Sequence, residues 1–278
     1  MSIPTAFQHL VDDAAIFPPG LAPLPDAVTA HLDHLASAHA DLVGPFVVDA
    51  ARLDALADHG APGLRVSVVL PTPADVADVV ARADAAGLVL ASLEVKLGDG
   101  DPVAGVAVVA GATPDGVPAY VEVPRPTSPA WPAVLDAVVT HGLRLKFRTG
   151  GTEAAAFPSE DEVAAWIEAA VAHGVPFKCT AGLHHATRHT GATTGFEHHG
   201  YLNVLLAAVR AASGDGSAVR AALAERDPVT LAAVVGGLPA DDLVRARTAF
   251  TSYGSCSIAE PLDDLTSLHL IPQTKEIA

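Results

Sequence analysis

The stretch LRLKFRTGG (143–151) begins with alternating apolar and charged side chains. Successive side chains of a β-strand point to opposite faces, so this period of two predicts a strand. Its apolar face consists of Leu143, Leu145 and Phe147, and its charged face consists of Arg144, Lys146 and Arg148. Because an apolar strand face packs under helices, the charged face is expected to point into the interior of the fold or into a functional site.

A second stretch, PFKCTAG (176–182), has the same form and places Lys178 opposite Phe177 and Cys179. Asp12 and Asp13 come before the first strand-like run and are expected at a helix C-terminus or in a turn. The other strand-like runs are AAIF (14–17), PFVVDA (45–50), LRVSVVLP (64–71), LVLASLEVKLG (88–98), PAYVEVP (118–124) and FTSYGSCSIAE (250–260).

Segments with helical apolar spacing separate these runs. One of them, SEDEVAAWIEAAVAHG, opens with the capping pair Ser159 and Glu162 and stops at Gly174. Strands that alternate with helices form parallel sheets, and eight such units in 278 residues predict an α/β fold, a (β/α)8 barrel. Residues 195–249 predict extra helices before the last strand, and the whole chain, 1–278, is predicted to be one domain. An open doubly wound sheet is the alternative, which the lack of a glycine-rich phosphate loop after the first strand disfavours.

The composition argues against several classes of function. The formal net charge of −16 disfavours binding to nucleic acid or to anionic lipid, because both need a basic face. No apolar run is long enough to predict a membrane span, and the N-terminus does not read as a secretory signal. Two cysteines make no disulfide framework. We therefore expect a cytoplasmic protein that acts on a small molecule, with a homo-oligomer left open.

The same alternation predicts a charged barrel interior. In SLEVKLG (92–98) Glu94 and Lys96 oppose the apolar face, and so does Glu122 in AYVEV (119–123). With Lys146, Arg148 and Lys178 they form a set near the C-terminal strand ends, where the active sites of such barrels lie. A structural network of ion pairs is the alternative, but burying so many ions costs roughly several kcal/mol for each before pairing. The set therefore favours a functional pocket.

Lys146 and Lys178 lie on neighbouring strands of the predicted barrel. The chain has only four lysines, the other two being Lys96 and Lys275. Two ammonium groups a few ångströms apart disfavour each other's charge, so one lysine is expected to lose its proton near neutral pH and become a nucleophile. A carboxylate such as Glu94 or Glu122 can relay protons beside it.

The segments LKFRTGG and FKCTAG resemble the strand-six and strand-seven motifs of deoxyribose-phosphate aldolase and related class I aldolases. The resemblance implies that Lys146 forms a Schiff base and that Lys178 promotes its deprotonation. YGSCS (253–257) is similar to the strand-eight segment of that family, which implies that Gly254 and Ser255 help to hold a substrate phosphate. Arg148 departs from the family pattern, and so does Leu183 with the histidine after it. Deoxyribose phosphate is therefore not the expected substrate. The segments FPPG, RTGG, TAGLHH and GSCS also resemble a bacterial barrel group, and this resemblance implies no particular activity.

Five of the 13 histidines fall in GLHHATRHTGATTGFEHHGYLNV (182–204), directly after the strand that carries Lys178. Residues 182–203 are predicted to cross the C-terminal rim as a lid, with His184 or His185 reaching the lysines and with His199 and Asn203 at the same rim. On a helix, His185 and His189 would share one face. Histidine binds metals and transfers protons, but the spacing matches no established zinc signature. No cofactor is predicted, and a divalent metal on this loop is the alternative.

The sequence thus predicts a Schiff-base lyase or aldolase that acts on a small anionic carbonyl compound. Lys146 attacks the carbonyl, Lys178 assists, and Glu94 or Glu122 moves protons. The predicted substrate-binding residues are Lys96, Arg148, Thr149, Gly150, Gly182, His184, His185, His199, Asn203, Gly254 and Ser255. Two alternatives stay open. One is a metal-assisted barrel enzyme that uses the histidine loop, and the other is a non-catalytic barrel that holds an anion on Lys146, Arg148 and Lys178.

Overall fold

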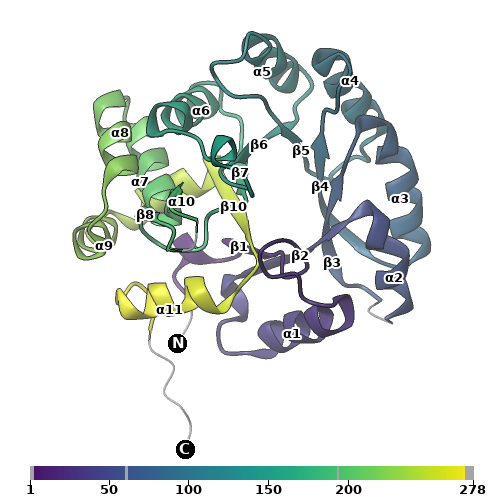
Figure 1. Cartoon of the computed structure of the whole chain (residues 1–278), viewed down its shortest axis with the longest axis horizontal. Helices are drawn as coiled ribbons and strands as arrows, with labels where there is room; N and C mark the ends of the chain where they lie inside the picture. Colours follow the sequence, from purple (N-terminus) through teal and green to yellow (C-terminus); the bar gives the residue numbers. More distant parts are fainter. Residues whose placement is uncertain (1–2, 60–61, 193, 273–278) are drawn as a thin grey trace, which may run out of the picture.

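The computed structural model describes residues 3–59, 62–192 and 194–272, and its core is a closed ring of parallel strands (Figure 1). Around the ring the order is β1-β10-β7-β6-β5-β4-β3-β2, so the first and last barrel strands of the chain are neighbours. Helices surround the ring (Figure 1). The predicted (β/α)8 barrel is confirmed. Lys275 lies outside the described residues.

The barrel strands match seven of the predicted runs closely and differ at the first. They are β1 (Val11–Asp13), β2 (Val43–Asp49), β3 (Arg65–Leu70), β4 (Val89–Lys96), β5 (Ala119–Glu122), β6 (Arg144–Arg148), β7 (Phe177–Thr180) and β10 (Phe250–Ser255). The run AAIF (14–17) is a turn instead of a strand, in which Phe17 N–H donates to Ala14 O at 2.9 Å. Two short strands, β8 (His189–Thr190) and β9 (Glu197–His198), form a separate antiparallel hairpin.

Helices follow the strands, and the extra ones predicted before the last strand are α7 to α10. The α-helices are α1 (Leu24–Ala36), α2 (Leu53–Asp58), α3 (Val76–Ala85), α4 (Pro102–Ala112), α5 (Trp131–Thr140), α6 (Glu160–Ala172), α7 (Tyr201–Ala212), α8 (Gly216–Ala224), α9 (Pro228–Gly236), α10 (Ala240–Ala249) and α11 (Ala259–Ser267). Single 3₁₀ turns lie at Thr5–Phe7, Ala40–Leu42, Ala50–Arg52, Pro73–Asp75 and Ala154–Ala156. Among the described residues no helix combines the length and the apolar character needed to cross a membrane.

The outer faces of the strands pack under the helices, as the alternation predicts. Phe147 of β6 stacks on Trp166 of α6 with ring centroids 5.0 Å apart, and on Phe177 of β7 at 4.8 Å. Cys179 is fully buried in the same layer. Each such large apolar side chain contributes roughly 1.5–3 kcal/mol by burial. This packing fixes which face of β6 and β7 turns inward and therefore points both lysines into the barrel.

Candidate active site

Lys146 and Lys178 occupy paired positions on the neighbouring strands β6 and β7, as predicted. Their side chains are 2% and 1% exposed. Strand β6 continues past Lys146 to Arg148, and β7 continues past Lys178 to Thr180. The lysines therefore lie inside the barrel, one layer below the strand ends at which they were expected.

Glu94 of β4 joins the two lysines. Its Oε2 lies 2.9 Å from Lys146 Nζ, and its Oε1 accepts hydrogen bonds from Lys178 Nζ and, at 2.7 Å, from Ser67 Oγ. Burial alone would raise the pKa of Glu94, but the charges of Lys146 and Lys178 outweigh burial and hold that pKa well below its usual range. Glu94 is thus an ionised carboxylate between two cations.

Asp12 of β1 belongs to the same cluster, although the sequence predicted it to lie at a helix C-terminus or in a turn. Its Oδ2 accepts hydrogen bonds from Lys178 Nζ at 2.6 Å and from Ser252 Oγ at 2.7 Å. Burial alone would lower the pKa of Lys178, but Asp12 and Glu94 outweigh burial and raise it. Lys178 therefore keeps its proton. Because β1 has only three residues, its sequence is too short to show the alternation that would have identified Asp12.

Glu122, Arg148 and Lys96 extend the cluster toward the mouth of the barrel. Glu122 Oε2 lies 3.3 Å from Lys146 Nζ, and Glu122 Oε1 accepts a hydrogen bond from Arg148 Nε at 2.9 Å. Burial would raise the pKa of Glu122, but Lys146 and then Arg148 outweigh burial and lower it. Lys96 pairs with Glu122 across β4 and β5 and is exposed. The structure thus brings these predicted residues together with Lys146.

Thr149, Gly150 and Gly182 connect the segments that follow β6 and β7. Thr149 Oγ1 donates to Ala181 O at 2.6 Å. A Cβ atom on Gly150 would lie 2.8 Å from Gly182 Cα, and Gly182 has a φ of +80°, which favours glycine. The backbones of the two segments therefore pack directly on each other at Gly150 and Gly182. This packing explains both glycines structurally, and their contact with a substrate stays a prediction.

Gly254 and Ser255 end β10 beside β1, where Gly254 pairs with Asp12. Ser255 is 1% exposed, and its Oγ donates to Ser257 O at 2.7 Å. The Ser255 hydroxyl is therefore engaged within its own turn. The expected contact of this segment with a substrate phosphate stays a prediction.

The histidines that directly follow β7 contact the segment that follows β10. Figure 1 draws β8 on the same side of the strand ring as α7 and α8. His184 Nδ1 lies 3.2 Å from Glu260 Oε2, and His185 Nδ1 lies 3.3 Å from Asp264 Oδ2, so both histidines contact α11. No hydrogen bond or ion pair within the described residues joins either histidine to the barrel lysines. His184 Nδ1 also lies 3.7 Å from Cys256 Sγ, directly after the end of β10. Closure of the pocket mouth by this segment stays a prediction.

His199 and Asn203 are fully buried. His199 Nε2 donates to Pro158 O at 2.8 Å, and burial lowers the pKa of His199 to about 4. Asn203 Nδ2 donates to Ala222 O and Glu225 O, at 2.8 Å each. Both side chains are therefore engaged by backbone carbonyl groups, and their place at the rim of the pocket stays a prediction.

Ring contacts join three histidines of the segment, edge to face between His185 and His189 and stacked between His189 and His198. The rings of His185 and His189 lie 4.9 Å apart, and those of His189 and His198 lie 5.0 Å apart. In the described part of the chain, no group of three or more His, Cys, Asp or Glu residues is arranged to hold a metal ion.

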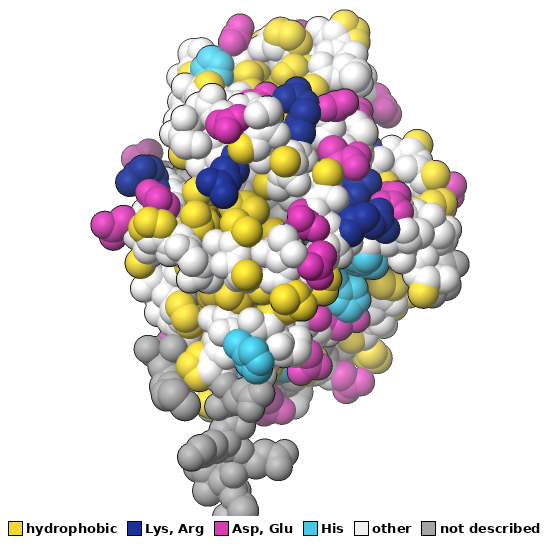
Figure 2. Space-filling model, turned by 90° about the vertical axis from the view of Figure 1, so that its left-hand side faces the viewer, with side chains coloured by type: hydrophobic (Ala, Val, Ile, Leu, Met, Phe, Trp, Pro, Cys, Tyr) yellow, Lys and Arg dark blue, Asp and Glu magenta, His cyan; other side chains and the backbone are white. Residues whose placement is uncertain are grey.

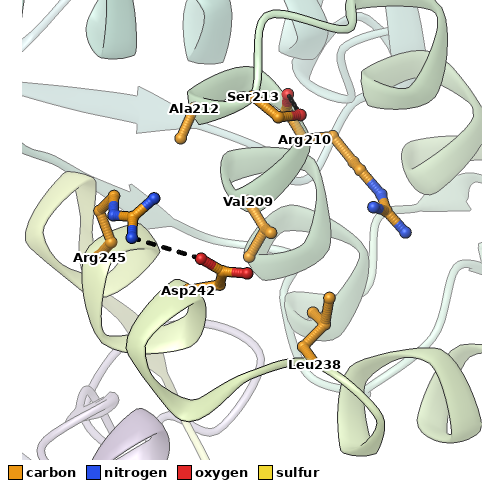
Figure 3. Close-up of a pocket in the computed structure, with 7 residues that line it drawn as sticks. All are labelled: Val209, Arg210, Ala212, Ser213, Leu238, Asp242 and Arg245. Carbon is orange, nitrogen blue, oxygen red and sulfur yellow. Dashed lines mark hydrogen bonds and ion pairs between the residues drawn. The ribbon is translucent and has the colours of Figure 1, made fainter.

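A small surface pocket of about 120 Å³ lies between α7 and α10 (Figure 3). Its lining consists of Val209, Arg210, Ala212, Ser213, Leu238, Asp242 and Arg245. Arg245 Nη2 lies 3.4 Å from Asp242 Oδ1, so one of the two arginines that line the pocket forms an ion pair. Figure 2 shows this side of the molecule, where charged side chains of both signs surround a band of apolar ones. Nothing in this pocket resembles the interior cluster.

No protein-family model matches the chain, and no curated protein is significantly similar to it. The interior cluster of Asp12, Glu94, Glu122, Lys146 and Lys178 therefore carries the functional argument by its own geometry.

Proposed function

We propose that this protein is a lyase of the class I aldolase type, in which Lys146 forms a Schiff base with a small anionic carbonyl compound. The observation that carries the proposal is the buried pair of Lys146 and Lys178, joined by Glu94 inside a parallel barrel. Barrels of this kind commonly carry active sites on the C-terminal side of their strands. The resemblance of LKFRTGG and FKCTAG to class I aldolase motifs supports the same assignment.

The surroundings of the two lysines divide their roles. Lys178 lies between Asp12 and Glu94 and acts as a fixed cation. Lys146 shares Glu94 but also contacts Glu122, which lies toward the mouth, so Lys146 is the lysine that can release a proton and attack. Attack on the carbonyl carbon followed by loss of water yields an iminium ion. That ion has the same charge as the ammonium group it replaces, so Glu94 and Glu122 stabilise both states.

The cations nearer the mouth favour an anionic substrate. The Arg148 side chain is 39% exposed and can present its remaining N–H groups to a carboxylate or phosphate. Lys96 is exposed on the adjacent part of the rim. In a chain with a formal charge of −16, two such cations at the mouth of the barrel form a local attraction for anions.

Access to Lys146 requires motion, because only 2% of its side chain is exposed. The segments after β6 and β7 lie closest along the chain to the two lysines, and they are packed against each other through Gly150 and Gly182. Imine formation is therefore expected to follow an opening of these segments, and long incubations are the appropriate assay.

The test is to incubate the protein with small aldehydes and ketones, with and without a carboxylate or phosphate group, and to reduce with borohydride. Mass spectrometry is expected to locate the adduct on Lys146. Lys146→Arg retains the charge but cannot form an imine, so it should abolish the adduct, whereas Lys275→Arg should leave the Lys146 adduct intact. Adducts confined to Lys275, or none for any carbonyl compound, contradict the proposal. Stoichiometric metal in the purified protein together with no adduct would favour the metal-assisted alternative.

A further inference from the structure

Six charged side chains form one line of contacts through the barrel, and their signs alternate. In order they are Arg148, Glu122, Lys146, Glu94, Lys178 and Asp12. The line holds three cations and three anions, so its formal charge is zero. A proton that leaves any one member therefore unbalances its neighbours unless it moves to an adjacent group.

Only one end of this line meets solvent. The exposed fraction of the side chain is 39% at Arg148 and 15% at Glu122, and it falls to 2% at Lys146 and at Glu94. On the far side, Lys178 is 1% exposed. A proton that leaves Lys146 along the line therefore reaches water in the direction of Glu122.

The two carboxylates beside Lys146 differ in their capacity to take that proton. Both oxygens of Glu94 are engaged, Oε1 by Lys178 and Ser67 and Oε2 by Lys146. Moving the Lys146 proton to Glu94 would leave the buried Lys178 ammonium group with one anionic partner, Asp12, in place of two, which is costly. Glu122 Oε2, in contrast, is buried and accepts no hydrogen bond among the described residues, although Lys146 Nζ lies 3.3 Å away.

We infer that Glu122 carries protons between Lys146 and solvent, and that Glu94 remains an ionised anchor throughout. The inference rests on the proposed Schiff-base function for its chemical purpose, because the amine must be neutral before it attacks. Glu94 and Glu122, whose roles the sequence could not distinguish, thus have different roles in the site.

The step conserves charge and atoms. An N–H bond of the Lys146 ammonium group breaks, and an O–H bond forms on Glu122 Oε2, which leaves a neutral amine beside a neutral carboxyl group. Arg148 donates to the other oxygen of Glu122 and favours its ionised form. The carboxyl group therefore passes the proton on to water at the mouth.

Hydrogen exchange of the lysine ammonium groups tests the inference without any substrate. Lysine-selective ¹⁵N labelling of the full chain, with signals assigned by Lys→Arg variants, resolves Lys146 from Lys178. In Glu122→Gln, exchange at Lys146 is expected to slow by about tenfold or more, whereas exchange at Lys178 should change by less than about twofold. Lys178 is a matched control because it is equally buried and shares Glu94 but does not contact Glu122. Unchanged exchange at Lys146 would overturn the inference.

A second variant keeps the test decisive if Glu122→Gln fails to fold. Arg148→Met removes the hydrogen bond to Glu122 Oε1 and leaves a more basic carboxylate, so exchange at Lys146 is expected to become faster. A rate identical to that of the unmodified protein would overturn the assignment. Because neither measurement uses a carbonyl compound, a failure here is distinct from a failure of borohydride trapping, which would overturn the lyase proposal.

Discussion

Lys178 shows how this barrel accommodates a buried cation. Its ammonium group is neutralised by Asp12 and Glu94 on two other strands and lies 5.5 Å from the centroid of the Tyr120 ring. Removing an ion from water costs roughly several kcal/mol, which close partners on more than one side offset. In the proposed mechanism, a fixed cation of this kind is an electrostatic element of the site and not a nucleophile.

Replacing Lys178 tests that role. In Lys178→Met, the carboxylates of Asp12 and Glu94 stay buried without their shared cation, so we expect the free energy of unfolding to fall by about 3–5 kcal/mol at pH 7. Urea denaturation measures the change. Lys96→Met, at an exposed position, should change it by less than about 0.5 kcal/mol. Similar losses in both variants would mean that burial of the charge is not the cause.

Strands β6 and β7 position the two lysines, and the close approach of the segments after them limits how far their ends can separate. Gly150 and Gly182 let the two backbones touch, and Thr149 N–H donates to Thr180 O at 2.9 Å. A side chain at either glycine would push the strand ends apart. The spacing of the lysines therefore depends on residues that carry no chemistry of their own.

Gly150→Ala examines this contact. A Cβ atom placed 2.8 Å from Gly182 Cα meets backbone that cannot rotate away, so we expect the free energy of unfolding to fall by about 1–3 kcal/mol. Thermal and urea unfolding report the change. Gly111→Ala on α4, where a Cβ would meet no atom within 4 Å, should be neutral or stabilising by up to about 1 kcal/mol. If Gly150→Ala changed the free energy of unfolding no more than Gly111→Ala does, the close contact of the two backbones would not exclude a side chain at position 150.

The stability of the whole molecule is expected to depend on pH through His199, which joins the segment after β7 to Pro158 before α6. Its pKa is lowered by burial to about 4, whereas an exposed histidine titrates near 6.5. Above about pH 6.5 both folded and unfolded forms are neutral. As the pH falls from there toward 4, the unfolded chain binds the proton first, so stability is lost across this window.

This loss is expected to reach at most about 1.4 kcal/mol per pH unit, measured as the free energy of unfolding in urea from pH 7.5 down to 4. His199→Asn should flatten the profile between about pH 6.5 and 4, because Asn does not titrate there. His141→Asn, at an exposed position, should retain the original slope. A His199→Asn profile parallel to that of the parent protein would assign the pH dependence to other groups.

The barrel and the two inward lysines follow from the sequence alone, because alternation with period two and helical spacing are local properties that each segment shows by itself. LRLKFRTGG and PFKCTAG were enough to place Lys146 and Lys178 side by side. Asp12 could not be found in this way. Its strand is short, and it meets Lys178 only because the ring closes between β1 and β10, at opposite ends of the chain.

The course of the histidine segment was also decided by tertiary structure. Its place after β7 suggested contact with the lysines, whereas the ion-pair partners of His184 and His185 are Glu260 and Asp264 of α11, a helix much later in the sequence. The same holds for the two carboxylates. Alternation turns both Glu94 and Glu122 inward, yet only the assembled barrel engages both oxygens of Glu94 and leaves one oxygen of Glu122 toward Lys146. Local periodicity sets the direction of a side chain, whereas its partners depend on how distant segments pack.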